Sequence, residues 1–320
     1  MRQFVEMQKE HDCFFMIVDY HALNTIQDAK TMRQSIIDLA TDYLAIGLDP
    51  KRAVIFKQSD VSEHTELAWI FDTITTVPYL ERAHAYKDAI ANKREATVGL
   101  FNYPMLMAAD ILLYDTDVVP VGADQKQHVE ITRDTAQKFN NAYGETFKLP
   151  EAKILSNVAV VPGIDGRKMS KSYNNTIPLF ADDAEIEKLV MSIVTDSEPY
   201  GAGEKSVETA RNAQFVAGNS LAVTDFYHPA NVYFIHKLFR SEEDLRWLYT
   251  EQLAGKYKKL KEALIADIKT FIKPLRERRK EIASDTSAVL KVLKEGGQRA
   301  KAVASRKMDE VRSRIGVKLS

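Results

Sequence analysis

Residues 13–56 read CFFMIVDYHALNTIQDAKTMRQSIIDLATDYLAIGLDPKRAVIF, and this stretch decides the fold class. Residues 13–18 and 53–56 are short apolar runs typical of buried strands. Between them, residues 32–45 repeat their apolar side chains with the spacing of a helix. A strand, a helix and a second strand in this order predict a parallel pair joined by a helical crossover.

The same alternation continues towards the C-terminus. Helical patterns cover residues 63–74 and 104–113, and residues 118–121 form a further short strand that ends at Gly122. From about Asp182 only helical patterns follow, and Gly201, Gly203 and the pair Gly296–Gly297 are expected to break them. The sequence therefore predicts an α/β protein with a doubly wound parallel sheet, followed by an all-helical domain.

Composition limits the classes of function. The 320 residues suit two domains of roughly 150 residues each. With 44 Lys and Arg against 45 Asp and Glu, the net charge is −1, so any contact with nucleic acid must use a local basic patch. Two basic clusters, 256–262 and 276–280, are candidates, and the second contains Arg276, Arg278 and Arg279. On pattern alone, each cluster is more often an ordinary solvated helix face.

Several kinds of site are excluded. Cys13 is the single cysteine, which rules out a disulfide or a cysteine-based metal site within one chain and fits a reducing cytoplasm. No apolar run approaches the roughly 18 residues of a membrane span. The sequence also lacks a His-Glu-x-x-His pair, a P-loop and a Gly-x-Gly-x-x-Gly turn after a strand, so we expect no protein-bound metal and no dinucleotide site.

The segment 165–172, DGRKMSKS, carries the clearest chemical signal. Lys168 and Lys171 place two ammonium groups on one loop with glycine and serine, and such a loop can grip a polyphosphate leaving group. On spacing alone, an ordinary basic surface loop explains the segment equally well.

Residues 168–172, KMSKS, are identical to the signature of the class I aminoacyl-tRNA synthetases. Residues 108–114, AADILLY, and 119–128, VPVGADQKQH, resemble the tryptophanyl branch of that class, as do 19–22, DYHA, and 195–197, TDS. The resemblance spans nearly the whole chain. The tyrosyl enzymes share the fold and a Gly-x-Asp-Gln element, but their neighbouring sequence differs.

The resemblance implies a tryptophan pocket. The indole N–H is a donor that needs one buried acceptor among apolar walls, and Asp110 matches the acceptor in that family. Without the resemblance, Asp110 would be read as a helix acid paired with a lysine or arginine. The residues matching the rest of this pocket are Tyr103, Met107, Val119 and Val121 around the ring, with Gln125 and His21 near the amino and carboxylate end. For the two valines, simple sheet core is the alternative.

The resemblance also implies an ATP site. Gly122, Ala123 and Asp124 follow a strand, where a glycine permits close approach and a carboxylate can accept from ribose hydroxyls. Val161 matches a position whose backbone meets the adenine. The signature residues complete this set: Lys168, Met169, Ser170, Lys171 and Ser172. ATP would act as a substrate with Mg²⁺, and Lys168 and Lys171 would stabilise the departing pyrophosphate.

The expected organisation and reaction follow from the resemblance. Residues 1–178 would form the Rossmann-like catalytic domain, and 179–320 a helical domain that binds the tRNA anticodon, with its last helix packing back on the first domain. The chain would activate L-tryptophan with ATP, transfer it to tRNA(Trp) in the cytoplasm and form a homodimer. A synthetase-like protein that binds tryptophan or RNA without catalysis is the alternative, and a tyrosyl enzyme is a second one.

Families of this kind open with a strand and a turn that carries the HIGH-type signature, which meets the ATP phosphates. Residues 1–6, MRQFVE, match the middle of the helix that follows this turn. We therefore expect the HIGH segment to be absent from the printed chain, which should leave unpaired strand edges in the sheet and little ATP–pyrophosphate exchange.

Overall fold

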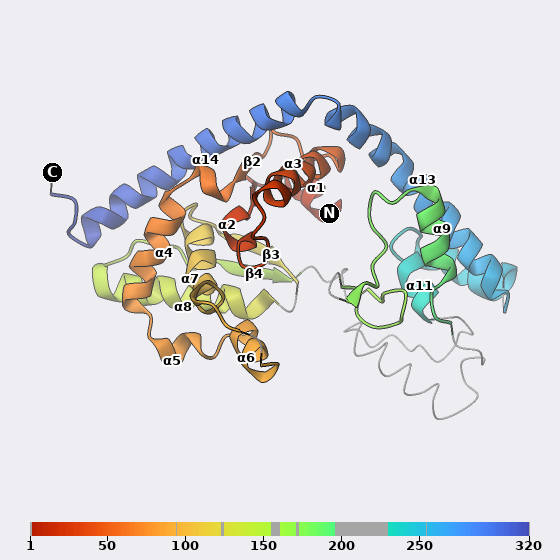
Figure 1. Cartoon of the computed structure of the whole chain (residues 1–320), viewed down its shortest axis with the longest axis horizontal. Coiled ribbons are helices and arrows are strands. Elements are labelled where there is room, and N and C mark those ends of the chain that lie inside the picture. Colours follow the sequence, from red (N-terminus) through yellow and green to blue (C-terminus); the bar gives the residue numbers. More distant parts are fainter. Residues whose placement is uncertain are drawn as a thin grey trace. The chain divides into compact units, whose positions relative to one another are not determined.

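The computed structural model describes residues 2–93, 95–122, 125–154, 161–170, 173–195, 230–253 and 255–319. These residues divide into two compact units (Figure 1). Unit 1 comprises Met1–Leu155 together with Arg279–Ser320, and unit 2 comprises Ser156–Arg278. The change of unit thus falls at residue 155, before the expected boundary at 178, because Val161 and Ile164 pack with the apolar core of unit 2.

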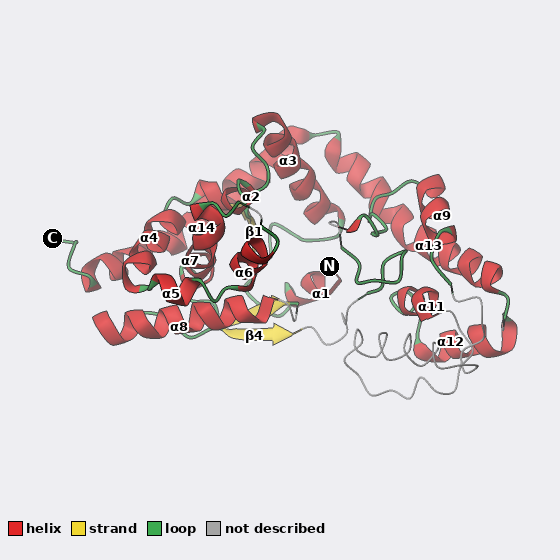
Figure 2. Ribbon diagram, turned by 60° about the horizontal axis from the view of Figure 1, so that its bottom comes forward, coloured by secondary structure: helices red, strands yellow, loops and turns green. Residues whose placement is uncertain are grey.

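The strands of unit 1 pair in parallel. Strand β1 (Phe14–Ile17) pairs with β2 (Val54–Lys57), and β3 (Val118–Val121) pairs with β4 (Glu151–Ile154) (Figure 2). Helices α2 (Asp19–Ala22) and α3 (Ala29–Ala45) connect the first pair, and α8 (Lys126–Tyr143) connects the second. In the described part of the chain the strands form these two separate pairs, and β4 is a strand that the sequence pattern did not predict.

Both faces of the β1–β2 pair are covered, as a doubly wound sheet requires. Phe14 and Phe56 belong to one apolar cluster, which includes residues of α4 (Glu63–Ile74), α7 (Val98–Leu112) and α8. The alternate residues Ile17 and Ile55 belong to a second cluster, which includes residues of α3. Because successive side chains of a strand point to opposite faces, this alternation gives each helix layer its own core.

The remaining helices of unit 1 are α1 (Arg2–Met7), η1 (Gln58–Asp60), α5 (Val77–Leu80), α6 (His84–Ala91) and α14 (Thr286–Arg314). The predicted helix at 63–74 is confirmed with those bounds as α4. The helix predicted at 104–113 begins earlier, at Val98, because the Thr97 hydroxyl caps it by accepting a hydrogen bond from the Leu100 N–H.

Helix α14 corrects one prediction. Gly296 and Gly297 do not break a helix but lie inside α14, where it crosses β2 (Figure 1). A Cβ atom at Gly296 would stand 1.8 Å from the Ile55 carbonyl oxygen. Glycine is therefore required by the close approach of the helix to the strand backbone, and α14 covers an edge of β2 that would otherwise be exposed.

Unit 2 is helical in its described residues. It contains α9 (Asp183–Met191), α11 (Ala230–His236), α12 (Glu242–Trp247), the π-helical turn η5 (Leu248–Gln252) and most of α13 (Tyr257–Ala283). The expected breaks at Gly201 and Gly203 lie outside the described residues. No helix in the described part of either unit is long and apolar enough to cross a membrane.

Candidate active site

Asp110 lies in the C-terminal half of α7, and its neighbours Ala109 and Ile111 are buried. Only 7% of the Asp110 side chain is exposed. A carboxyl group in such surroundings requires hydrogen-bond donors, because isolated burial of its charge is strongly unfavourable. The partners of this group therefore define the site.

Gln58 and His21 donate to this carboxylate. The Gln58 Nε2 lies 2.8 Å from Oδ1 and 3.0 Å from Oδ2 of Asp110, and the Gln58 Oε1 accepts a hydrogen bond from the Tyr20 N–H at 3.2 Å. The His21 Nε2 lies 2.9 Å from the Asp110 Oδ2. Gln58 is completely buried, so its amide is used at both ends.

The topology explains why these side chains converge. His21 follows the carboxyl end of β1, and Gln58 follows the carboxyl end of β2. Since β1 and β2 are adjacent and parallel, both side chains lie at the same edge of the sheet, where α/β folds usually bind ligands. Asp19 strengthens this edge by accepting hydrogen bonds from the Ser59 N–H at 3.0 Å and the Ser59 hydroxyl at 2.5 Å.

His64 approaches Asp110 from α4. Its Nδ1 lies 2.7 Å from the Asp110 Oδ1, although the angle is less favourable than in a straight hydrogen bond. Its Nε2 lies 2.8 Å from the Tyr114 hydroxyl. Burial by itself would raise the pKa of Asp110, but hydrogen bonds from His21 and His64 outweigh it and hold that pKa below its ordinary value. The carboxylate is consequently ionised and acceptor-only at neutral pH.

This environment differs from the ordinary helix ion pair that was the alternative interpretation of Asp110, and the role of Asp110 as indole acceptor stays a prediction. Its partners are two histidines and a glutamine, not the lysine or arginine of an ordinary helix ion pair. Sequence reasoning missed Gln58, His64 and Tyr114. A polar residue directly after a strand, as Gln58 is, was the available signal, whereas nothing local distinguished His64 or Tyr114.

Among the other residues of the expected tryptophan pocket, Tyr103 contacts a residue of the Asp110 site, and the rest are half-buried or exposed. The Tyr103 ring packs edge-on to His21 at 6.1 Å, and its hydroxyl lies 2.5 Å from the His128 Nε2. Met107 is half-buried, one helical turn before Asp110. The remaining members are the half-buried Val119 and Val121 on β3, and Gln125, which is exposed and immediately precedes α8.

Among the ATP-site residues expected in unit 1, Gly122 is exposed directly after β3. Ala123 and Asp124 lie outside the described residues. In the parts of the chain that are described, no three His, Cys, Asp or Glu side chains form a group that could hold a metal ion.

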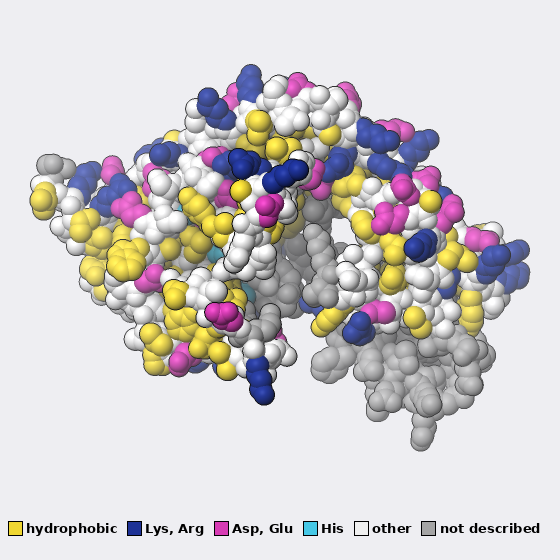
Figure 3. Space-filling view, in the orientation of Figure 1, with side chains coloured by type: hydrophobic (Ala, Val, Ile, Leu, Met, Phe, Trp, Pro, Cys, Tyr) yellow, Lys and Arg dark blue, Asp and Glu magenta, His cyan; other side chains and the backbone are white. Residues whose placement is uncertain are grey.

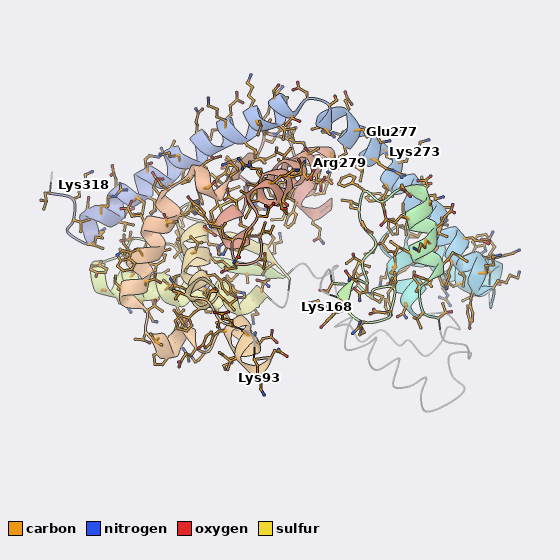
Figure 4. All side chains as sticks on the ribbon, in the orientation of Figure 1. Lys93, Lys168, Lys273, Glu277, Arg279 and Lys318 are labelled. Carbon is orange, nitrogen blue, oxygen red and sulfur yellow. The ribbon has the colours of Figure 1, made fainter. Side chains whose placement is uncertain are left out.

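In unit 2, residues 161–170 form a tight hairpin. Pro162 bridges Lys168 in antiparallel fashion, and the Met169 N–H donates to the Val161 carbonyl at 2.8 Å. The Gly166 backbone has a φ of 80°, a conformation that glycine adopts readily. Lys168 is exposed on this hairpin (Figure 4), while Lys171 and Ser172 lie outside the described residues.

Asn175 holds the hairpin in shape. This residue is 1% exposed, its Oδ1 accepts from the Ser170 N–H at 2.7 Å, and its Nδ2 donates to the Lys168 carbonyl at 3.0 Å. A Cβ atom at Gly163 would stand 2.3 Å from the Asn175 side chain, so the glycine makes room for it. The backbone around Lys168 and Ser170 is therefore fixed by a buried amide while the lysine side chain reaches solvent.

The three arginines expected to contact tRNA have different surroundings. Arg276 donates to the Asp183 carboxylate at 2.5 Å within unit 2, and Arg279 donates to the Asp42 carboxylate at 2.5 Å within unit 1 (Figure 4). Arg278 is exposed. Two of these side chains thus hold their own units together, and the exposed Arg278 is the one presented to solvent.

Comparisons with known proteins agree with this fold. A family model described as class I tRNA synthetases (W and Y) matches residues 1–229. A tryptophan–tRNA ligase from Fusobacterium nucleatum is 44% identical over 320 residues, which cover 99% of this chain and 92% of that protein. A second tryptophan–tRNA ligase, from Rhodopirellula baltica, is 41% identical and is covered to 93%.

Solved structures give the same result. Tryptophanyl-tRNA synthetase from Campylobacter jejuni, complexed with ADP and tryptophan, superimposes with a TM-score of 0.82 at 39% identity, covering 98% of this chain and 93% of that one. The enzyme from Mycoplasma pneumoniae superimposes with a TM-score of 0.80 at 25% identity, covering 98% of this chain and 91% of that one. This chain therefore belongs to the class I tRNA synthetase family for tryptophan and tyrosine. Within that family, the relatives that match it over nearly their whole length are tryptophan–tRNA ligases.

Proposed function

We propose that this chain is a tryptophan–tRNA ligase, which activates L-tryptophan with ATP and transfers it to tRNA(Trp). The observation that carries the proposal is the state of Asp110, a buried carboxylate that hydrogen bonds from His21 and His64 keep ionised. The indole ring offers a single N–H donor and no acceptor, so an acceptor-only group is its natural partner. The names of the relatives support the same substrate.

In the proposed reaction, the tryptophan carboxylate attacks the α-phosphate of ATP, and pyrophosphate leaves. Asp110 accepts the indole N–H, Tyr103, Met107, Val119 and Val121 enclose the ring, and Gln125 with His21 bind the amino acid end. In this structure the His21 Nε2 donates to Asp110, so His21 must turn partly away to serve that end. The adenylate then passes its tryptophanyl group to the terminal ribose of the tRNA, with no covalent enzyme intermediate.

ATP binds as a substrate. Gly122, Ala123 and Asp124 hold the ribose, and the Val161 backbone meets the adenine. Lys168 and Lys171, with Met169, Ser170 and Ser172, stabilise the charge that develops on pyrophosphate. Magnesium, when bound, neutralises phosphate charge, and we expect the phosphates of the nucleotide to hold it.

Lys171→Ala tests this clamp. Because the lysine acts on charge that develops in the transition state, the rate of adenylate formation should fall far more than tryptophan affinity. Single-turnover adenylate formation and equilibrium binding of tryptophan measure the two quantities. Equal losses in both would show that the loop is merely structural.

ATP–pyrophosphate exchange is the decisive experiment for the function. Exchange that depends on tryptophan and not on tyrosine supports the proposed ligase. Binding of labelled tryptophan without exchange would instead fit a non-catalytic binding protein of synthetase type, in line with the little exchange that the sequence predicts. Selective binding of tyrosine would identify the tyrosyl branch.

The proposal extends to partners and location. The helical unit 2, Ser156–Arg278, which covers part of the expected domain 179–320, binds the tRNA anticodon, and the exposed Arg278 contributes to the contact. Charging of tRNA for protein synthesis assigns the chain to the cytoplasm.

A homodimer is the proposed assembly. Trp69, Val77 and Val98 are 70%, 59% and 79% exposed, and Figure 3 shows hydrophobic side chains gathered on unit 1 over α4 and α5. Exposed apolar surface of this kind marks an association face, and a second copy of the chain is the occupant we propose. Light scattering should give twice the mass of one chain, and Trp69→Glu should give a monomer.

A further inference from the structure

His64 is completely buried, yet both ring nitrogens face polar groups. Its Nδ1 lies 2.7 Å from the Asp110 Oδ1, and its Nε2 lies 2.8 Å from the Tyr114 hydroxyl. The same ring stacks against Phe56, with 6.3 Å between the ring centroids. A histidine that only filled space in this core would not need two polar partners on opposite sides.

The two partners determine where the proton sits. A carboxylate can only accept, so the nitrogen that faces Asp110 must carry the hydrogen. The other nitrogen is hydrogen-bonded to the Tyr114 hydroxyl. Burial, together with the nearby charge of Asp110, raises the pKa of Tyr114 well above its ordinary value, which keeps that hydroxyl protonated. The result is a His64 ring whose Nδ1 hydrogen faces Asp110 and whose orientation is fixed through Nε2 by Tyr114.

The partners divide unequally over the two oxygens of Asp110. Oδ1 faces His64 and Gln58, both fully buried, whereas Oδ2, which Gln58 also reaches at 3.0 Å, faces His21, whose side chain is 18% exposed. The buried pair can hold Oδ1 permanently. His21 is the partner that can move, which leaves Oδ2 available to a ligand.

We propose that His64, oriented by Tyr114, is a positioning residue that keeps Asp110 acceptor-only and turns Oδ2 towards the substrate ring. This inference rests on the proposed function, since it names the group that sets its specificity. A ring N–H donor is satisfied by such a carboxylate.

The test compares tryptophan with its benzothiophene analogue, in which sulfur replaces the ring N–H while shape is kept. Calorimetry on the full chain measures both dissociation constants and hence their ratio. In the unmodified chain the N–H should be worth roughly ten- to a hundredfold in affinity, the range for a hydrogen bond to a charged group. His64→Leu should reduce this ratio towards one, and His64→Asn, which can still donate to Asp110, should retain most of it.

The ratio separates positioning from general damage, because a distorted pocket weakens both ligands alike. His236→Leu is the matched control, since His236 is equally buried and lies between Asp267, at 2.6 Å, and the Tyr249 hydroxyl, at 3.2 Å, in unit 2. That variant should leave the ratio unchanged. If His64→Leu does not fold, Tyr114→Phe removes a single hydroxyl and should lower the ratio by a smaller factor.

The outcomes are distinguishable. If the ratio of the two dissociation constants in His64→Leu equals that of the unmodified chain, the inference is overturned and the proposed function stays intact. The same holds for Tyr114→Phe when the leucine variant does not fold. A ratio near one in the unmodified chain would instead show that Asp110 does not receive the indole N–H, and the proposed site would fail with it.

Discussion

Gly296 offers a direct test of how α14 supports the site. In Gly296→Ala the new Cβ would stand 1.8 Å from the Ile55 oxygen and 2.7 Å from the Ile55 carbonyl carbon. Ordinary contacts between such atoms are about 3.5 Å, so helix and strand must separate by roughly 1.7 Å. Leu293 and Ala300, on either side of Gly296 along α14, belong to different core clusters, and both clusters would be loosened.

The magnitude follows from two opposing effects. Alanine in place of glycine in a helix interior favours folding by about 1 kcal/mol. Overpacking a close contact costs about 1–3 kcal/mol and sometimes more, and an overlap with strand backbone belongs at the upper end. We expect unit 1 to lose about 2 kcal/mol of its free energy of unfolding, or more. Because Gln58 follows β2 three residues after Ile55, tryptophan binding should weaken as well.

Urea unfolding followed by circular dichroism measures the stability, and hydrogen exchange with mass spectrometry assigns the loss to unit 1. Gly297→Ala is a graded comparison, since its Cβ would meet the Asp60 Cβ at 2.9 Å, and should cost less. Gly255→Ala in unit 2 has open space around the new atom and should leave unit 1 unchanged. If Gly296→Ala does not lower the free energy of unfolding of unit 1, the close approach of helix and strand would be refuted, and the helix propensity of alanine would be the effect that remains.

Three further predictions concern charge. Asp110→Asn should weaken tryptophan binding about ten- to a hundredfold by calorimetry, through loss of a charge-assisted hydrogen bond, and an unchanged affinity would contradict its role. Arg278→Glu should weaken tRNA binding in a salt-dependent way and leave adenylate formation intact. Arg279→Glu, placed beside Asp42, should instead lower the urea midpoint of unit 1. The reverse pattern would contradict the exposure of Arg278 and the ion pair of Arg279. Burial holds the pKa of His236 below its ordinary value of 6.5, so the unfolded chain binds a proton on this side chain at a higher pH than the folded chain does. Unit 2 should therefore lose stability as the pH falls below 6.5. His236→Gln should flatten this pH dependence of stability between about pH 7 and pH 5.5.

The fold class was readable because its signals are local. Phe14 and Ile17 lie on opposite faces because side chains alternate along a strand, and a few neighbouring positions show this alternation. The helical spacing of residues 63–74 is likewise visible over a few neighbouring positions. The KMSKS signature is equally local and identified the family before any coordinate was known. The sequence did not predict strand β4, because its four residues, EAKI, have too few apolar side chains for a periodic pattern.

Long-range approach is what the tertiary structure decided. Asp110 was recognisable as a binding residue by resemblance, but its partners come from three other elements, and Gln58 alone is 52 positions away. Gly296 was read as a helix break because local propensity disfavours glycine in helices. Its actual place, against the Ile55 backbone, depends on a strand some 240 positions earlier in the chain. Local periodicity records which face of an element is buried, whereas the partner that buries it, and the donors that keep a carboxylate charged, are set only when distant segments pack together.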